Sequence, residues 1–66
     1  MQITVNGQQT DVADHLTVAA LIETLGYAQK LGAVAVNMTF VPLTAYGETV
    51  LKEGDNVEIL APVSGG

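Results

Sequence analysis

The chain has 66 residues, of which 48% are hydrophobic and none is cysteine, and seven acidic residues against two lysines give a net charge of −5. This length allows one domain held by its hydrophobic core, because without cysteine there is no disulfide, thiolate zinc site or cysteine-held iron–sulfur cluster. Nucleic-acid binding is excluded by the acidic charge and the absence of arginine, and no apolar run approaches the ~20 residues of a membrane span.

The N-terminal segment predicts a β-hairpin. Ile3 and Val5 alternate with polar residues, which is the pattern of a strand with one buried face. Asn6-Gly7 follows, a strong hairpin signal because a type I′ turn needs positive φ at both central positions. Residues 8–12 then form the returning strand, which is polar enough to lie at a sheet edge.

Residues 17–25 are predicted to form a helix. Thr17 is the expected N-cap, with its hydroxyl accepting from an amide of the first turn. Gly26 suits the left-handed position that ends a helix, and Tyr27 can then fold back on Ile22. The apolar residues that recur at helical spacing and form one stripe are Val18, Leu21, Ile22 and Leu25.

The second half of the chain reads as strands joined by short connections. Residues 33–37 are a third strand, with Val34 and Val36 inward and Ala33 and Ala35 outward. Residues 40–41 are a short fourth strand, which ends at a proline because proline cannot donate to a ladder. The remaining expected elements are a helical turn at 43–47, an extended segment at 49–51 and a last strand at 57–63.

This order predicts a two-layer α+β domain. One helix with a single apolar stripe must cover one face of a mixed sheet of four to five strands. The last strand should lie beside the first, in the middle of the sheet, and the other sheet face should stay partly open. We expect residues 1–63 to form the domain and residues 64–66 a flexible tail.

The sequence shows no recognisable set of catalytic residues. His15 is the only histidine and lies just before the helix, so it is expected to be a solvated loop residue, as are Asp11 and Asp14. No nucleophile–base set and no phosphate-binding glycine loop can be assembled. Core or near-core packing is the default expectation for the aromatic residues, Tyr27, Tyr46 and Phe40. We therefore expect a protein that is not an enzyme, with no metal and no stably bound cofactor.

The chain closes with Gly65-Gly66, directly after the last predicted strand. A glycine pair adopts almost any backbone dihedral and can thread a slot too narrow for a Cβ. The tail from Ser64 to Gly66 can therefore present the terminal carboxylate to the active site of another protein.

Four segments together resemble the ThiS family of sulfur carriers: MQITVNG, TVAALIETLG, VAVNMTFVP and TVLKEGDNVEILAPVSGG. The resemblance covers essentially the whole chain. Its more specific part combines residues 35–37, 41–42 and 54–55 with the glycine tail. A tyrosine, Tyr46, stands where the family often has a tryptophan.

The resemblance implies a β-grasp, ubiquitin-like fold and a mechanism. A ThiF-type adenylyltransferase would use ATP to adenylate the carboxylate of Gly66, and a persulfide sulfur would replace AMP to leave a thiocarboxylate. A ThiG-type thiazole synthase would take that sulfur to build the thiazole ring. Gly65 and Ser64 would thread the partner's slot. The chain is expected to be soluble and cytoplasmic, because it has no membrane span and its N-terminus lacks a signal-peptide pattern. When free of its partners it is expected to be a monomer.

A carrier needs a surface by which partners hold it. Leu60 alternates with an inward Ile59, so it should face the open side of the sheet. Glu58 on the same face could pair with a basic partner residue. The apolar residues expected to form a docking patch beside the tail are Leu60, Ala33, Ala35, Pro62 and Val63.

Three alternatives stay open. Pro62 before the tail also resembles the small subunit of molybdopterin synthase, a related sulfur carrier that is usually longer and lacks the pattern of residues 37–42. A ubiquitin-like modifier that conjugates to lysines through Gly66 is a second alternative. A plain interaction domain with an inert tail is the third.

Overall fold

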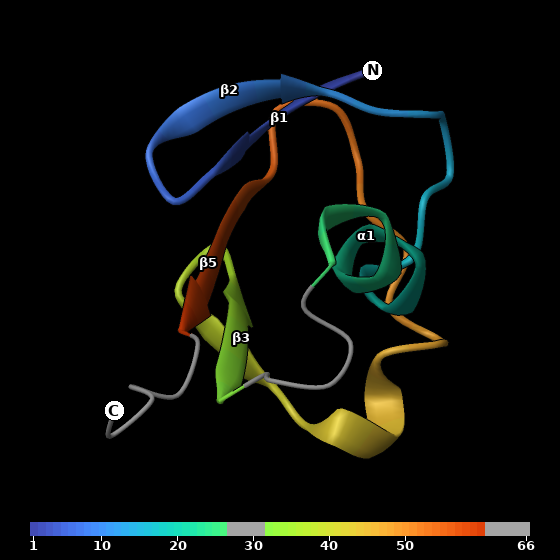
Figure 1. Cartoon of the computed structure of the whole chain (residues 1–66), viewed down its shortest axis with the longest axis vertical. Helices are drawn as coiled ribbons and strands as arrows, with labels where there is room; N and C mark the ends of the chain where they lie inside the picture. The colour runs from blue at the N-terminus through green and yellow to red at the C-terminus, as the bar shows by residue number, and fades with distance from the viewer. Residues whose placement is uncertain (27–31, 61–66) are drawn as a thin grey trace.

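A computed structural model of the chain describes residues 1–26 and 32–60 (Figure 1). Its elements in chain order are strands β1 (Gln2–Val5) and β2 (Gln8–Asp11), helix α1 (Val18–Leu25), strands β3 (Ala33–Val36) and β4 (Thr39–Val41), the 3-10 turn η1 (Leu43–Ala45) and strand β5 (Asn56–Leu60).

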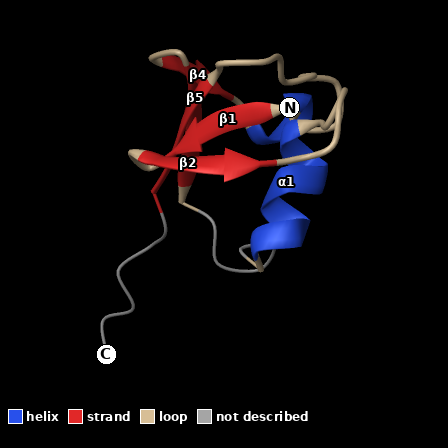
Figure 2. Cartoon of the chain, turned by 90° about the horizontal axis from the view of Figure 1, so that it is seen from above, coloured by secondary structure: helices blue, strands red, loops and turns tan. Residues whose placement is uncertain are grey.

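The five strands form one mixed sheet in the order β2-β1-β5-β3-β4. β5 pairs parallel to β1 and antiparallel to β3, and the other two pairs are antiparallel. Helix α1 lies against one face of this sheet (Figure 2). The predicted two-layer α+β arrangement is confirmed, including the position of the last strand beside the first.

β5 is the middle strand of the sheet, with β1 on one edge and β3 on the other, and its side chains alternate between the two faces. Val57 and Ile59 are buried, whereas Glu58 and Leu60 are exposed. The strand begins one residue earlier than predicted, at Asn56, and the predicted residues 61–63 lie outside the described part of the chain.

Helix α1 forms where its caps and apolar stripe predict it. The Thr17 hydroxyl accepts a hydrogen bond of 3.1 Å from the Ala20 N–H, and Gly26 adopts the left-handed conformation with φ of 82°. The buried residues of the helix are Val18, Leu21 and Ile22. The predicted contact of Tyr27 with Ile22 lies outside the described residues. Within the described ranges, no helix is long and apolar enough to cross a membrane.

The core lies between α1 and the sheet. Its buried residues are Ile3, Val5, Val18, Leu21, Ile22, Val34, Val41, Tyr46, Leu51, Val57 and Ile59. Burial raises the pKa of the Tyr46 hydroxyl above its ordinary value, so the folded chain prefers the neutral phenol. Burial of the neutral Tyr46 phenol therefore stabilises the fold fully below pH ~10. Above that pH the phenol ionises more readily in the unfolded chain, so the free energy of unfolding falls.

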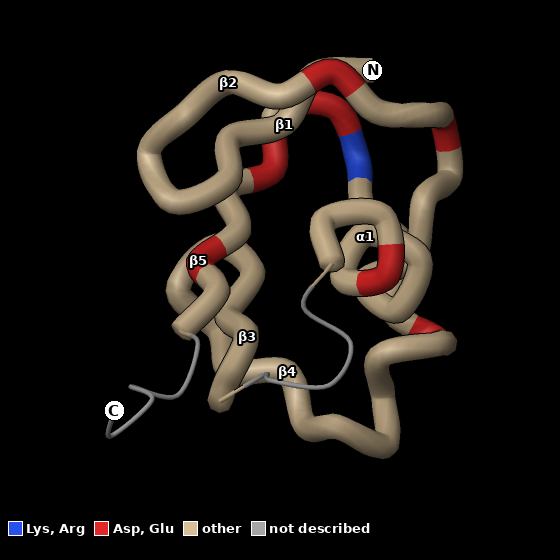
Figure 3. Tube along the Cα trace, in the orientation of Figure 1, with Lys and Arg blue, Asp and Glu red and all other residues tan. Residues whose placement is uncertain are grey.

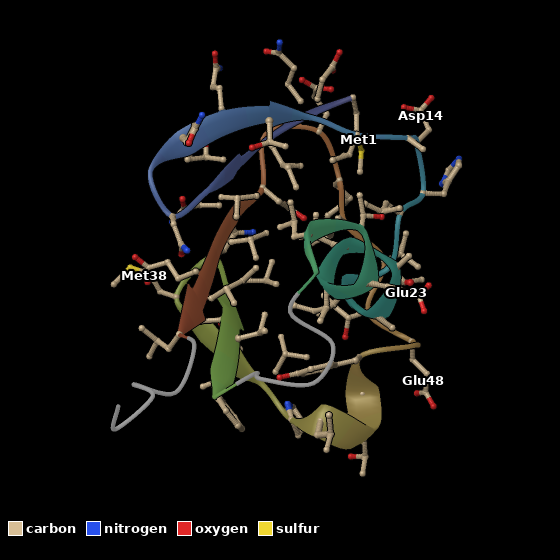
Figure 4. All side chains as sticks on the ribbon, viewed as in Figure 1. Met1, Asp14, Glu23, Met38 and Glu48 are labelled. Atoms are coloured by element: carbon tan, nitrogen blue, oxygen red, sulfur yellow. The ribbon has the colours of Figure 1, made fainter. Side chains whose placement is uncertain are left out.

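Both hairpin turns have the type I′ conformation. In the first, Asn6 and Gly7 have φ of 50° and 82°, as the sequence predicts. In the second, between β3 and β4, Asn37 and Met38 have φ of 51° and 70°. Met38 lies on the outside of the molecule, away from α1, and its side chain is 89% exposed (Figure 4). Its Cβ therefore carries the steric cost of positive φ with no compensating burial.

Replacing Met38 with glycine is expected to raise the free energy of unfolding by about 0.5–1 kcal/mol, because the relief of left-handed strain exceeds the entropy that glycine adds to the unfolded chain. Chemical denaturation measures this change. Met38→Ala is the matched control, since it removes the same exposed side chain but keeps a Cβ at positive φ and should gain nothing. Equal stabilisation by both variants would contradict the explanation.

Candidate functional site

The sheet face opposite α1 gathers the residues that the sequence predicts for docking. Ala33 lies directly opposite Leu60, and Ala35 lies opposite Glu58, in the pairing of β3 with β5. Their neighbours along both strands face the core, so these four side chains point to the open face. The structure therefore brings together four of the predicted partner-binding residues.

A fifth residue on this face was not predicted there. Phe40 pairs with Ala35 across β3 and β4, and it is 65% exposed. The expectation of core or near-core packing for Phe40 is wrong, whereas Tyr46 is buried as expected. The signal was present in the sequence, because Val41 must face the core and the residue before it then faces the opposite side.

These residues form one surface, which we call the open-face patch: Ala33, Ala35, Phe40, Glu58 and Leu60. They line a surface hollow of about 230 Å³ together with Asn6 and Val34. Leu60 is 67% exposed, so the patch presents two large apolar side chains to solvent. Apolar side chains gathered in this way are typical of a surface that another protein covers.

The charge of the patch is negative. Glu58 is its charged member, and acidic segments are spread over the chain, with one in β5 (Figure 3). Among the described residues, the salt bridge that forms joins the Met1 amino group to Asp14 at 3.3 Å, so Glu58 has no such partner there. An acidic group between exposed apolar residues favours a partner with a basic side chain at this position.

The beginning of β5 is held by a polar network that sequence reasoning missed. Asp55 is 6% exposed, and its carboxylate accepts from the Lys52 N–H at 2.8 Å and from Asn37 Nδ2 at 3.0 Å. Asn37 Oδ1 in turn accepts from the Asn56 N–H at 2.9 Å. The sequence marked Asn37 and Asp55 only as part of a family resemblance, and their contact, 18 positions apart, gives that pattern a structural reason.

The end of β5 is held from both sides. The Asn6 amide makes two hydrogen bonds to the backbone of Ile59, and the Gly32 N–H donates to the Leu60 carbonyl at 2.8 Å. Leu60, a member of the open-face patch, is the last described residue of this part of the chain. The other predicted site residues lie outside the described part of the chain: Pro62, Val63, Ser64, Gly65 and Gly66.

The described residues offer no evident centre for chemistry. His15 is an exposed loop residue with φ of 62°. Asp14 forms a salt bridge with the N-terminal amino group of Met1, which lies beside it in Figure 4. No group of three or more His, Cys, Asp or Glu side chains within residues 1–26 and 32–60 is placed to hold a metal ion.

Comparisons with known proteins agree with this arrangement. The model of the ThiS family matches residues 3–66. The sulfur carrier protein ThiS of Escherichia coli is 32% identical over 66 residues, which cover 100% of both chains. The thiazole synthase of Paramagnetospirillum magneticum is 33% identical over the whole chain, but the chain spans only 20% of that protein. The crystal structure of thiamine biosynthesis protein ThiS from Geobacter metallireducens superposes with a TM-score of 0.83 at 36% identity and covers 100% of both chains.

Proposed function

Because the chain belongs to the ThiS family, we propose that it is a sulfur carrier protein of thiamine biosynthesis, which carries sulfur as a thiocarboxylate on Gly66. The observation that carries this proposal is the match over 100% of both chains to the carrier of Escherichia coli, so that the compared region extends to the end of this chain at Gly66. The fold supports it, since the solved structure of a ThiS protein has the same architecture.

The chemistry follows from the properties of a terminal carboxylate. With a pKa near ~3.5 it is ionised at neutral pH and is a poor electrophile. Attack of a carboxylate oxygen on the α-phosphorus of ATP releases pyrophosphate and gives an acyl adenylate, in which AMP is a good leaving group. A persulfide sulfur attacks the acyl carbon and expels AMP, which gives an acyl disulfide. A thiolate then attacks the sulfur that came from the partner's cysteine, so that a new disulfide forms on the partner and the thiocarboxylate leaves.

The chain itself supplies no group for these steps, so a ThiF-type adenylyltransferase is the proposed catalyst. Without cysteine, the sulfur can be held only at the carboxyl terminus of Gly66. Gly65 and Ser64 are proposed to lie in the narrow approach to the catalyst's active site, where glycine meets the least steric hindrance.

Thiazole synthase is the proposed acceptor of the sulfur. A protein named thiazole synthase in Paramagnetospirillum magneticum, and another in Magnetococcus marinus, each contain a region similar to this entire chain. In those proteins a region of this kind and a much longer sequence share one polypeptide. Such an arrangement supports a working partnership between the carrier and thiazole synthase.

The open-face patch is the proposed docking surface for both enzymes. It includes Leu60, the last described residue, and Pro62 and Val63 follow it closely in the sequence and are proposed to join the surface that a partner covers. Exposed Leu60 and Phe40 provide the apolar anchors, and Glu58 provides a charge for a basic side chain of the partner.

Intact-mass spectrometry tests the proposal. The chain is incubated with the ThiF-type adenylyltransferase of its own organism, ATP, a cysteine desulfurase and cysteine. We expect a mass change equal to the exchange of one terminal oxygen for sulfur. Isopeptide-linked adducts would indicate a protein modifier, and an unchanged mass would indicate an inert tail. Conversion only by the activating enzyme of molybdopterin synthase would indicate the related carrier.

A further inference from the structure

The parallel pairing of β1 with β5 stops before β5 ends. The two strands pair at Thr4–Asn56 and Val5–Val57, and the Asn6 N–H donates to the Val57 carbonyl at 2.9 Å. A regular parallel ladder would continue with an acceptor for the Ile59 N–H and a donor for the Ile59 carbonyl. The main chain cannot supply them, because it turns away at Asn6 into the β1–β2 hairpin.

The side chain of Asn6 supplies both missing groups. Its Oδ1 accepts from the Ile59 N–H at 2.8 Å, and its Nδ2 donates to the Ile59 carbonyl at 3.2 Å. A primary amide carries the same acceptor and donor as a peptide group. The Asn6 side chain therefore takes the place of two main-chain groups that would continue the ladder, the carbonyl of residue 6 and the N–H of residue 8, across 53 positions of sequence.

This amide clamp holds Ile59, next to the last described residue and five positions before Ser64, the first residue of the tail. On the other edge of β5, the Gly32 N–H holds the Leu60 carbonyl, so both edges of the strand are paired until the last described residue. From there residues 61–66 span at most about 20 Å when fully extended. Without the clamp, β5 would be free from residue 58 onward on its β1 side, and the tail would search a larger volume.

We propose that Asn6 is a positioning residue for the C-terminal tail: its side-chain amide extends the pairing of β1 and thereby holds in place the end of β5 to which the tail is connected. This inference rests on the proposed function, since it concerns how Gly66 reaches the site of adenylation. A docked carrier with a well-directed tail keeps its carboxylate at a high effective concentration in that site.

The fold contains a matched control for this residue. Asn37 occupies the same position in the second type I′ turn, with φ of 51°, and its amide also bonds the β5 backbone, at Asn56. It holds the beginning of β5, at the opposite end of the strand from Ile59 and Leu60. Asn6→Gly and Asn37→Gly each keep the positive φ of their turn and remove one amide clamp on β5, but only the first clamp holds the end to which the tail is connected.

The experiment measures adenylation by the ThiF-type enzyme through pyrophosphate release, together with hydrogen exchange of the Ile59 amide. Asn6→Gly is expected to lower kcat about tenfold, the effect of losing two hydrogen bonds that hold the end of β5, with KM changed less than twofold. The Ile59 amide is expected to exchange faster in this variant. Asn37→Gly is expected to leave kcat, KM and Ile59 exchange near their original values, although it lowers stability at least as much.

Three results would overturn the proposal. An equal loss of kcat in both variants would attribute the effect to general stability. A raised KM with unchanged kcat for Asn6→Gly would make Asn6 a direct contact of the partner. Unchanged kinetics would leave the clamp without a role in the reaction. If Asn6→Gly does not fold, Asn6→Asp replaces it, since it keeps the turn but sets an acceptor against the Ile59 carbonyl.

Failure of the proposed function gives a different pattern. In that case the unaltered chain itself is not adenylated, and the positioning proposal falls with it. Hydrogen exchange at Ile59 in the variants still reports whether the Asn6 amide holds the end of β5.

Discussion

One alanine added after Gly66 is expected to abolish thiocarboxylate formation, with a loss of at least about 100-fold, because catalysis falls by this amount when a reacting group is misplaced by only ~1 Å. The added residue moves the carboxylate by one residue length, about 3.5 Å, and also places a Cβ where the original chain has none. Intact-mass spectrometry of the reaction measures the loss, and rescue of a thiamine-requiring deletion strain measures it in cells.

Binding of the extended chain to the adenylyltransferase should be preserved, since the open-face patch is unchanged. Met38→Gly is a suitable control variant, because the exposed turn that it alters lies outside the patch and the tail, and it should be converted normally. Conversion of the extended chain without removal of the added alanine would show that the terminal carboxylate of Gly66 is not the working group.

Leu60→Asp is expected to weaken binding to the ThiF-type adenylyltransferase by about 30-fold, or about 2 kcal/mol, the usual cost of losing an apolar anchor at the centre of an interface. The side chain is 67% exposed, so the folded chain loses little by the change. In the complex, however, a carboxylate would have to be desolvated beside Glu58. Isothermal titration calorimetry measures the affinity, and chemical denaturation checks the fold.

Leu43→Asp is the matched control for this prediction. Leu43 is the same residue type, is 74% exposed, and lies in η1 outside the open-face patch. Phe40→Asp, on the patch, should weaken binding in the same direction as Leu60→Asp. Equal affinities for all these variants and the original chain would remove the patch from the docking surface, and an equal loss for Leu43→Asp would show that added charge alone is responsible.

Much of the fold could be predicted because its signals are local. The alternation of buried Val57 and Ile59 with exposed neighbours predicts the last strand, and the Thr17 and Gly26 caps fix the helix. The outward direction of Leu60 follows from the same alternation. These features need only the period of a strand or helix and the chemistry of a cap.

The contacts that hold β5 could not be predicted, because they depend on which distant residues the sheet brings together. Asn6 reads as a turn residue in the sequence, and only the register of β1 against β5 places its amide at Ile59. The second turn was missed because Met38 is not a typical residue for positive φ, and the pairing of β3 with β4 imposes that conformation. Phe40 was misplaced because aromatic residues are usually packed in cores.

The central position of β5 also has a consequence for biosynthesis. Until residues 56–60 emerge from the ribosome, the nascent chain can form two separate hairpins, and one edge of β1 and one edge of β3 remain bare. Bare strand edges promote aggregation and attract chaperones and proteases. A polypeptide truncated before β5 would keep both edges bare, so we expect truncated copies to aggregate or to be degraded more readily than the full chain.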